Sequence, residues 1–285
     1  KITQVNGEES ADHRHEIRRE LATYRENIAG TYSILEHRVR EQYLAIKNTT
    51  RFTDKTDAKE SQKRFRGALE RSGVDYSEAS VLTLTIDPKR FGSHKDATSA
   101  IREAKGRILS YLRYQIGESP TQVTASDFQR NGMLHYHIVL FGVRKVRESD
   151  NETGQPTISE SQIREYWDEK QDIGSQVAIS RAWTRNDEWV LHRDDKTVSL
   201  SYYLGKRVRR LVDLAGLDTD SVPGAYWRQA LFWVYGIRHI TCSDSLKETE
   251  PTGDNSGLPE IVEWEYIGTA RYEQIPSYIS RVMII

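Results

Sequence analysis

Cysteine is scarce in this sequence, where Cys242 is the only one among 285 residues. A single cysteine excludes an intramolecular disulfide and any zinc site that is built from several cysteines. Long apolar runs are missing too: no stretch approaches the length that crosses a membrane, and none has the charged start and apolar centre of a signal peptide. We therefore expect a cytoplasmic protein with no membrane partner.

The net charge is also close to zero, because 41 basic residues nearly balance 42 acidic ones. This balance excludes a uniformly basic nucleic-acid binder, although basic clusters occur at 14–19, 63–66, 144–147 and 206–210. The pattern Gly-x-x-x-x-Gly-Lys-Ser/Thr does not occur, so we expect no fused helicase and no nucleotide cofactor. Of the basic clusters, only 206–210 adjoins residues that could take part in catalysis.

The first 75 residues are dominated by helical patterns. Apolar residues recur at helical spacing over 16–47, with a break or kink at Gly30, and a second amphipathic helix is predicted at 59–71. We expect residues 1–75 to form a helical N-terminal extension without a chemical motif of its own.

The central part of the chain predicts an α+β domain. A strand at 81–86 is followed by a helix at 97–116, a hairpin with its first arm at roughly 122–129 and its second arm through 135–141, a short helix capped by Ser159, and a strand at 176–182. The order β-α-β-β-α-β is that of a ferredoxin-like or RRM-like antiparallel sheet with helices on one face. We expect this domain to span 76–250, with 251–285 as a C-terminal strand and tail packed on it.

Two histidines mark the second arm of the hairpin. The turn-forming pair Asn131-Gly132 precedes them, and side chains alternate along a strand, so His135 and His137 point to the same face. Neutral imidazole is a common ligand of divalent metals. Two imidazoles at this spacing therefore provide half of a coordination sphere.

A basic helix is predicted at 197–215. Its apolar residues form one stripe, whereas Tyr203, Lys206, Arg207 and Arg210 stand at i, i+3, i+4 and i+7 on a different face. Like charges at this spacing repel one another, so stability alone does not favour the arrangement. The alternatives are a surface for a phosphodiester and an ordinary solvated basic face.

Three motifs in this order resemble those of the HUH endonucleases, in particular the rolling-circle replication initiators of small plasmids and viruses. They are Val81-Leu-Thr-Leu-Thr85, His135-Tyr-His-Ile-Val-Leu-Phe141 and Tyr203-Leu-Gly-Lys206. The resemblance covers roughly 78–250. It implies an enzyme that nicks and rejoins single-stranded DNA at a replication origin, with host replication proteins as further partners.

The resemblance also implies roles for individual residues. His135 and His137 would hold Mg²⁺ or Mn²⁺, and Tyr203 would attack the phosphate to give a 5′-phosphotyrosine and a free 3′-hydroxyl. Lys206 would lower the pKa of the tyrosine or stabilise charge on the phosphoryl oxygens. Arg207 and Arg210 would contact the DNA.

The third metal ligand and the nucleophile each have an alternative. The family usually supplies an acidic or polar third ligand, for which Asp127 is the first candidate and Gln129 the second. We expect a three-residue connection to place Asp127 opposite His137, and a two-residue turn to place Ser126 there. Tyr202 would be the nucleophile if the helix were rotated about its axis.

Two other functions use the same elements. A conjugative relaxase or a single-strand DNA transposase of the same superfamily would share the metal and the tyrosine. A non-catalytic RRM-like nucleic-acid-binding protein would share the fold, but it would need exposed aromatic residues on the central strands. The corresponding face here has histidines and threonines.

Overall fold

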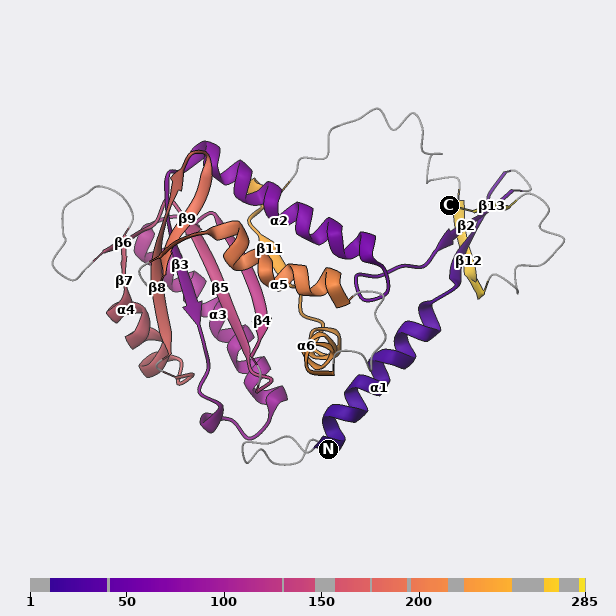
Figure 1. Cartoon of the computed structure of the whole chain (residues 1–285), viewed down its shortest axis with the longest axis horizontal. Coiled ribbons are helices and arrows are strands. Elements are labelled where there is room, and N and C mark those ends of the chain that lie inside the picture. Colours follow the sequence, from indigo (N-terminus) through magenta and orange to yellow (C-terminus); the bar gives the residue numbers. More distant parts are fainter. Residues whose placement is uncertain are drawn as a thin grey trace.

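The computed structural model describes residues 11–39, 42–129, 131–146, 157–174, 176–193, 196–214, 223–247, 264–271 and 282–284. Within these residues the fold is a mixture of α-helices and β-sheet (Figure 1). The six α-helices of this part are α1 (Ala11–Ile28), α2 (Lys55–Asp75), α3 (His94–Ile116), α4 (Glu160–Glu165), α5 (Leu200–Leu214) and α6 (Pro223–Val234). None of them is long and apolar enough to cross a lipid bilayer.

A seven-stranded sheet forms the centre of the protein, and all of its neighbouring strands are antiparallel. In spatial order it consists of β10 (Lys196–Ser199), β9 (Glu188–Arg193), β8 (Val177–Arg185), β3 (Glu78–Leu84), β5 (Leu134–Phe141), β4 (Gln122–Phe128) and β11 (Ile240–Cys242). A separate pair of short parallel strands, β6 (Arg144–Val146) and β7 (Thr157–Ser159), lies beside it.

The predicted order of the central elements is confirmed, because β3, α3, β4, β5, α4 and β8 follow one another with only short elements between them. A single π-helical segment, Tyr166–Lys170, extends α4. Its Trp167 is fully buried and donates a hydrogen bond from Nε1 to the backbone oxygen of Thr85, 2.9 Å away. This bond fixes the segment before β8 to the end of β3.

The two helices of the predicted order, α3 and α4, contribute to one core as expected, but the other face of the sheet also has helices. Leu82 of β3 points to a core that includes α3, whereas its neighbour Val81 points to a second core that includes α2 and α5. Both residues are buried, at 0% and 2% exposed. Because the central strands are apolar on both faces, each face needs its own layer of helices. Figure 1 shows α2 and α5 on one side of the sheet and α3 on the other.

The predicted helix over 16–47 is correct only for its first part. Helix α1 is followed by Gly30, whose φ of 74° is accessible to glycine at little cost. The chain then forms two strands, β1 (Thr31–His37) and β2 (Tyr43–Lys47). They pair with β12 (Trp264–Arg271) and β13 (Val282–Ile284) in a four-stranded sheet of order β12-β1-β2-β13. Pairing with strands more than two hundred residues away overrides the helical periodicity.

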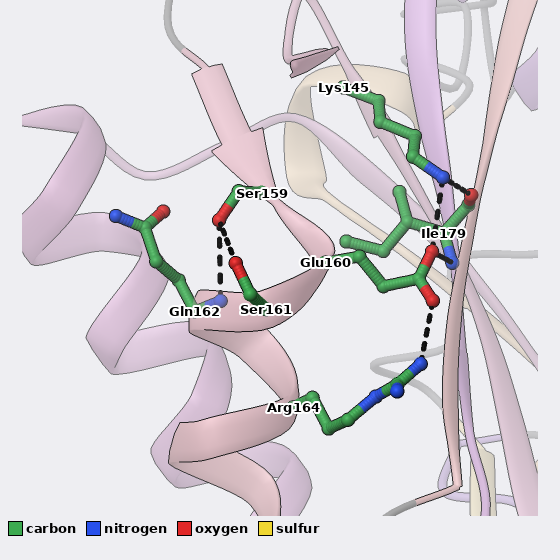
Figure 2. Close-up of polar contacts among 7 residues, drawn as sticks. All are labelled: Lys145, Ser159, Glu160, Ser161, Gln162, Arg164 and Ile179. Carbon is green, nitrogen blue, oxygen red and sulfur yellow. Dashed lines mark hydrogen bonds and ion pairs between the residues drawn. The ribbon is translucent and has the colours of Figure 1, made fainter. Parts of the chain in front are cut away.

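The start of α4 is fixed by a polar network (Figure 2). As predicted, Ser159 caps the helix, and its Oγ accepts a hydrogen bond from a backbone N–H of the first turn. The Glu160 carboxylate accepts bonds from Lys145 at 3.0 Å and Arg164 at 2.8 Å. Lys145 also donates to the backbone oxygen of Ile179 at 2.6 Å. Burial would raise the pKa of Glu160, but the Lys145 bond and these charges outweigh it and lower the pKa.

His239 lies buried between α6 and the sheet. Its ring stacks on Phe232 with centroids 3.7 Å apart, and its backbone oxygen accepts a hydrogen bond from the Ser126 N–H in β4. Burial, assisted by the positive charge of Arg51, lowers the pKa of His239 to about 3. The folded protein therefore contains this imidazole in its neutral form.

We expect His239 to make the protein sensitive to acid. Its pKa falls from 6.5 to about 3 on folding, so the unfolded chain binds the proton first and stability decreases as pH falls below 6.5. At about 1.4 kcal/mol per pH unit, the loss is about 3 kcal/mol at pH 4.5. Urea denaturation across this range should show a weaker pH dependence for His239→Gln than for wild type. The exposed His192→Gln is the control, and equal pH dependence in all three proteins would contradict the assignment.

Candidate functional site

The β4–β5 hairpin sets the positions of the candidate metal ligands. Gln129 and Met133 close it, with 2.9 Å from the Gln129 N–H to the Met133 oxygen. In the resulting register Asp127 faces His135 and Ala125 faces His137. The expectation that Asp127 or Ser126 lies opposite His137 is therefore wrong. Asp127 nevertheless shares a face with both histidines, because directly paired residues point to the same side.

The three side chains lie close together at the start of β5. The Nε2 atom of His135 is 3.8 Å from the Oδ2 atom of Asp127, and the rings of His135 and His137 are 4.9 Å apart in an edge-to-face arrangement. The side chains of His135 and Asp127 are 13% and 15% exposed, whereas His137 is 3% exposed. The site is thus lined by two imidazoles and a carboxylate in a largely desolvated place.

Thr83 orients the more buried imidazole. It pairs directly with His137 across β3 and β5, and its Oγ1 lies 3.0 Å from His137 Nδ1. When the imidazole proton is on Nδ1, this atom donates to the Thr83 oxygen. The Nε2 atom then has the lone pair with which to coordinate a metal. This role of Thr83 was not predicted, although its place in the alternating Val81-Leu-Thr-Leu-Thr85 strand puts it on the histidine face.

Tyr203 is the tyrosine that lies next to the histidines. Its ring centroid is 5.5 Å from that of His137, and the side chain packs against the core formed by α2 and the sheet. Leu200 and Leu204, both fully buried, fix this face of α5. Tyr202, one residue earlier, is 64% exposed. Tyr203 is therefore turned towards the sheet, apart from the exposed Lys206 that was expected on the same helical face.

The remaining predicted residues are more scattered. Lys206 is exposed and lines a surface hollow together with Tyr202. Arg207 and Arg210 lie on α5, but their side chains fall outside the described part of the structure. Gln129 lies at the end of β4, beyond Asp127. Within the described residues, no three His, Cys, Asp or Glu side chains are arranged as a ready-made metal-binding group.

The donor set nevertheless suits a divalent metal. Two imidazoles and one carboxylate on adjacent strands are ligand types that Mn²⁺ accepts, whereas Mg²⁺ prefers oxygen ligands and water. The Thr83 contact to His137 is the kind of outer interaction that orients a ligating imidazole. On ligand chemistry, the site therefore fits Mn²⁺ better than Mg²⁺.

The chain has a distant viral relative. A protein of Halorubrum pleomorphic virus 1, with the name Uncharacterized protein 1, is 23% identical over 288 residues, which cover 92% of this chain. The chain spans about half the length of that relative, 54% of it. No family model matches the chain, and no solved structure is significantly similar to it. The similarity connects the chain to a haloarchaeal virus and assigns no family.

Gly132, in the turn that sets the ligand register, should not tolerate a side chain. Its φ is 82°, and a Cβ atom there would lie 2.4 Å from Cε1 of the buried His94. We expect Gly132→Ala to lower the free energy of unfolding well beyond the ~1 kcal/mol of backbone strain alone. Gly117→Ala is the matched control, because its φ is 85° but nothing lies within 4 Å. Equal losses for the two variants in urea denaturation would contradict the packing argument.

Proposed function

We propose that the protein is an HUH-type endonuclease and strand transferase that initiates rolling-circle replication of a viral or plasmid genome. Its substrate is single-stranded DNA at a replication origin, and Tyr203 is its nucleophile. The observation that supports this most strongly is the approach of Tyr203 to His137, with ring centroids 5.5 Å apart. The two residues are 66 positions apart in the sequence and meet on one face of the sheet.

The fold is consistent with this proposal. The strand order β8-β3-β5-β4 is the one that a ferredoxin-like sheet requires for the elements β3, α3, β4, β5, α4 and β8. Both connecting helices contribute to the core on the face opposite the histidines, through Ile101 and Ile108 of α3 and Ile163 of α4. We therefore propose that the central domain is ferredoxin-like, with α2, α5 and the outer strands added to it.

The chemistry follows from a tyrosine beside a metal-binding face. The Tyr203 oxygen attacks the scissile phosphorus and loses its proton, a P–O bond to tyrosine forms, and the bond to the 3′ oxygen breaks. That oxygen takes up a proton and becomes a free 3′-hydroxyl. The phosphotyrosine preserves the phosphodiester energy, so the reverse attack rejoins the strand without ATP. A divalent ion bound by His135, His137 and Asp127 would polarise the phosphate oxygens.

Other residues of the chain assist this reaction. Thr83 holds the His137 ring in place through the Oγ1–Nδ1 contact. Lys206 lies one helical turn from Tyr203, within reach of charge that develops on the phosphoryl oxygens. We assign Arg207 and Arg210 to the DNA backbone, because cations on successive turns of a helix suit a phosphodiester chain. Gln129 remains the alternative to Asp127 as a third ligand.

The biological setting is inferred from the viral relative. A replicon of this type needs an initiator that creates a 3′-hydroxyl for the polymerase of its host, so host replication proteins are the expected further partners. The reaction would occur in the host cytoplasm. The name of the relative says nothing of an activity, so the distant similarity supports the viral context alone.

Incubation with Mn²⁺ and single strands from the presumed origin should yield a covalent protein–DNA adduct on a denaturing gel. We expect Tyr203→Phe to lose the adduct by at least about 10³-fold, because the nucleophile is removed. Tyr202→Phe, the matched control one residue away, should still form it. An adduct that persists in Tyr203→Phe and vanishes in Tyr202→Phe would reverse the assignment of the nucleophile. Binding without any adduct would favour the non-catalytic RRM-like protein.

Thr83 should tune the metal site without touching DNA. Thr83→Val removes the hydroxyl at nearly constant volume, so the His137 ring loses its orienting contact. We expect the Mn²⁺ concentration for half-maximal adduct formation to rise by about 10- to 100-fold. Thr124→Val, a buried threonine on the opposite face of neighbouring β4, is the control and should leave the requirement unchanged. An unchanged requirement in Thr83→Val would refute the orienting role.

A further inference from the structure

A hollow of about 600 Å³ lies between α2 and α5. It is lined by Gln62, Phe65, Arg66, Glu188, Ser199, Ser201, Tyr202, Gly205, Lys206 and Arg209. The two helices run alongside each other on the histidine side of the sheet (Figure 1). From α5 come residues at helical spacing i, i+3, i+4 and i+7, namely Tyr202, Gly205, Lys206 and Arg209. Apart from Lys206, no residue of this lining has a role in the proposed reaction.

The hollow is cationic. Arg66 of α2 and Lys206 and Arg209 of α5 all have exposed side chains, and they face the single carboxylate of Glu188. The Glu188 carboxylate accepts a hydrogen bond from the Ser199 hydroxyl. The Oγ atoms of Ser199 and Ser201 lie 2.9 Å apart. Cations from two helices around a group of hydroxyls match the donors that proteins use for phosphate oxygens.

Tyr202 supplies an aromatic surface to the same hollow. Its side chain is 64% exposed, although a tyrosine kept for packing would be expected inside. Exposed aromatic rings stack on bases, and bases offer their faces only when the strand is unpaired. Phosphate donors and a stacking ring together therefore favour single-stranded DNA over a duplex or a protein partner.

We infer that this hollow is a subsite that binds the single strand next to the cleavage position, with a phosphate at Arg66 and Arg209 and a base on Tyr202. The inference rests on the proposed function for its substrate. Because Tyr202 and Tyr203 are adjacent on α5, the hollow lies beside the nucleophile. The subsite makes α2, from the N-terminal extension, a part of the DNA-binding surface.

Arg66 provides the test, because it lies far from the reacting atoms in sequence and belongs to α2. The probe is a fluorescein-labelled oligothymidylate, whose anisotropy is measured against salt in the Tyr203→Phe background to prevent cleavage. We expect Arg66→Gln to weaken binding several-fold and to reduce the salt slope by about 0.7, the value for one lost phosphate contact on a single strand. Arg64→Gln is the matched control, since Arg64 is an exposed cation of the same helix that does not line the hollow.

Tyr202 tests the stacking. Tyr202→Ala should weaken binding by about 5- to 150-fold, the usual range for loss of one stacked base, with little change in salt slope. Tyr202→Phe keeps the ring and should bind as the parent does. If Arg66→Gln binds as Arg64→Gln does, or if Arg66→Gln weakens only the binding of a duplex, the subsite is refuted. Arg209→Gln provides a second cation variant if Arg66→Gln proves unstable.

The proposed subsite and the proposed nuclease activity can be refuted independently of each other. Adduct formation by wild type, with oligothymidylate binding that is indifferent to Arg66 and Tyr202, would preserve the function and overturn the subsite. Absence of adduct, with binding that still depends on both residues, would support the subsite in a protein that binds single strands without cleaving them. Loss of both would reject both.

Discussion

The pairing of β5 with β3 and β4 is the constraint on which the candidate site depends. Side chains alternate along a strand, so a slip of one residue would send His135 and His137 into the core under α3. The hairpin closure between Gln129 and Met133 holds the register, and in it Ile138 and Leu140 pack in one core while Val139 and Phe141 pack in the other. The polar residues that form the site are thus positioned together with apolar residues that take no part in it.

A second constraint is the packing of α5 against the sheet. Leu200 and Leu204 are fully buried in the same core as Phe65 of α2, and this packing turns Tyr203 towards His137. Helix α2 is therefore needed for the geometry of the site, although it lies before the three motifs in the sequence. A variant with a damaged α2–α5 contact would lose the approach of tyrosine to histidine while every motif residue remained present.

Local patterns were sufficient to predict much of the fold. Alternation identified the histidine face, turn residues located the hairpin, and helical spacing placed Tyr203 and Lys206 on α5. Errors arose where distant segments meet. The strands at 31–47 exist because β12 and β13 pair with them, and the helices of the second face come from before and after the central elements. The partner of His137 depended on a turn whose length the sequence left open, and Arg66 meets Tyr202 only through tertiary packing.

In the proposed function, the two adjacent tyrosines of α5 would have different roles. Neighbouring residues on an α-helix point about 100° apart, so Tyr203 contacts the sheet while Tyr202 faces solvent beside Lys206. A nucleophile must be held in a fixed, partly desolvated position, whereas a stacking residue must stay accessible to a strand that arrives and leaves. On the proposed function, α5 would meet both requirements with consecutive residues. Because the backbone sets the distance between them, a strand stacked on Tyr202 would stay close to Tyr203 until its stacked base was released.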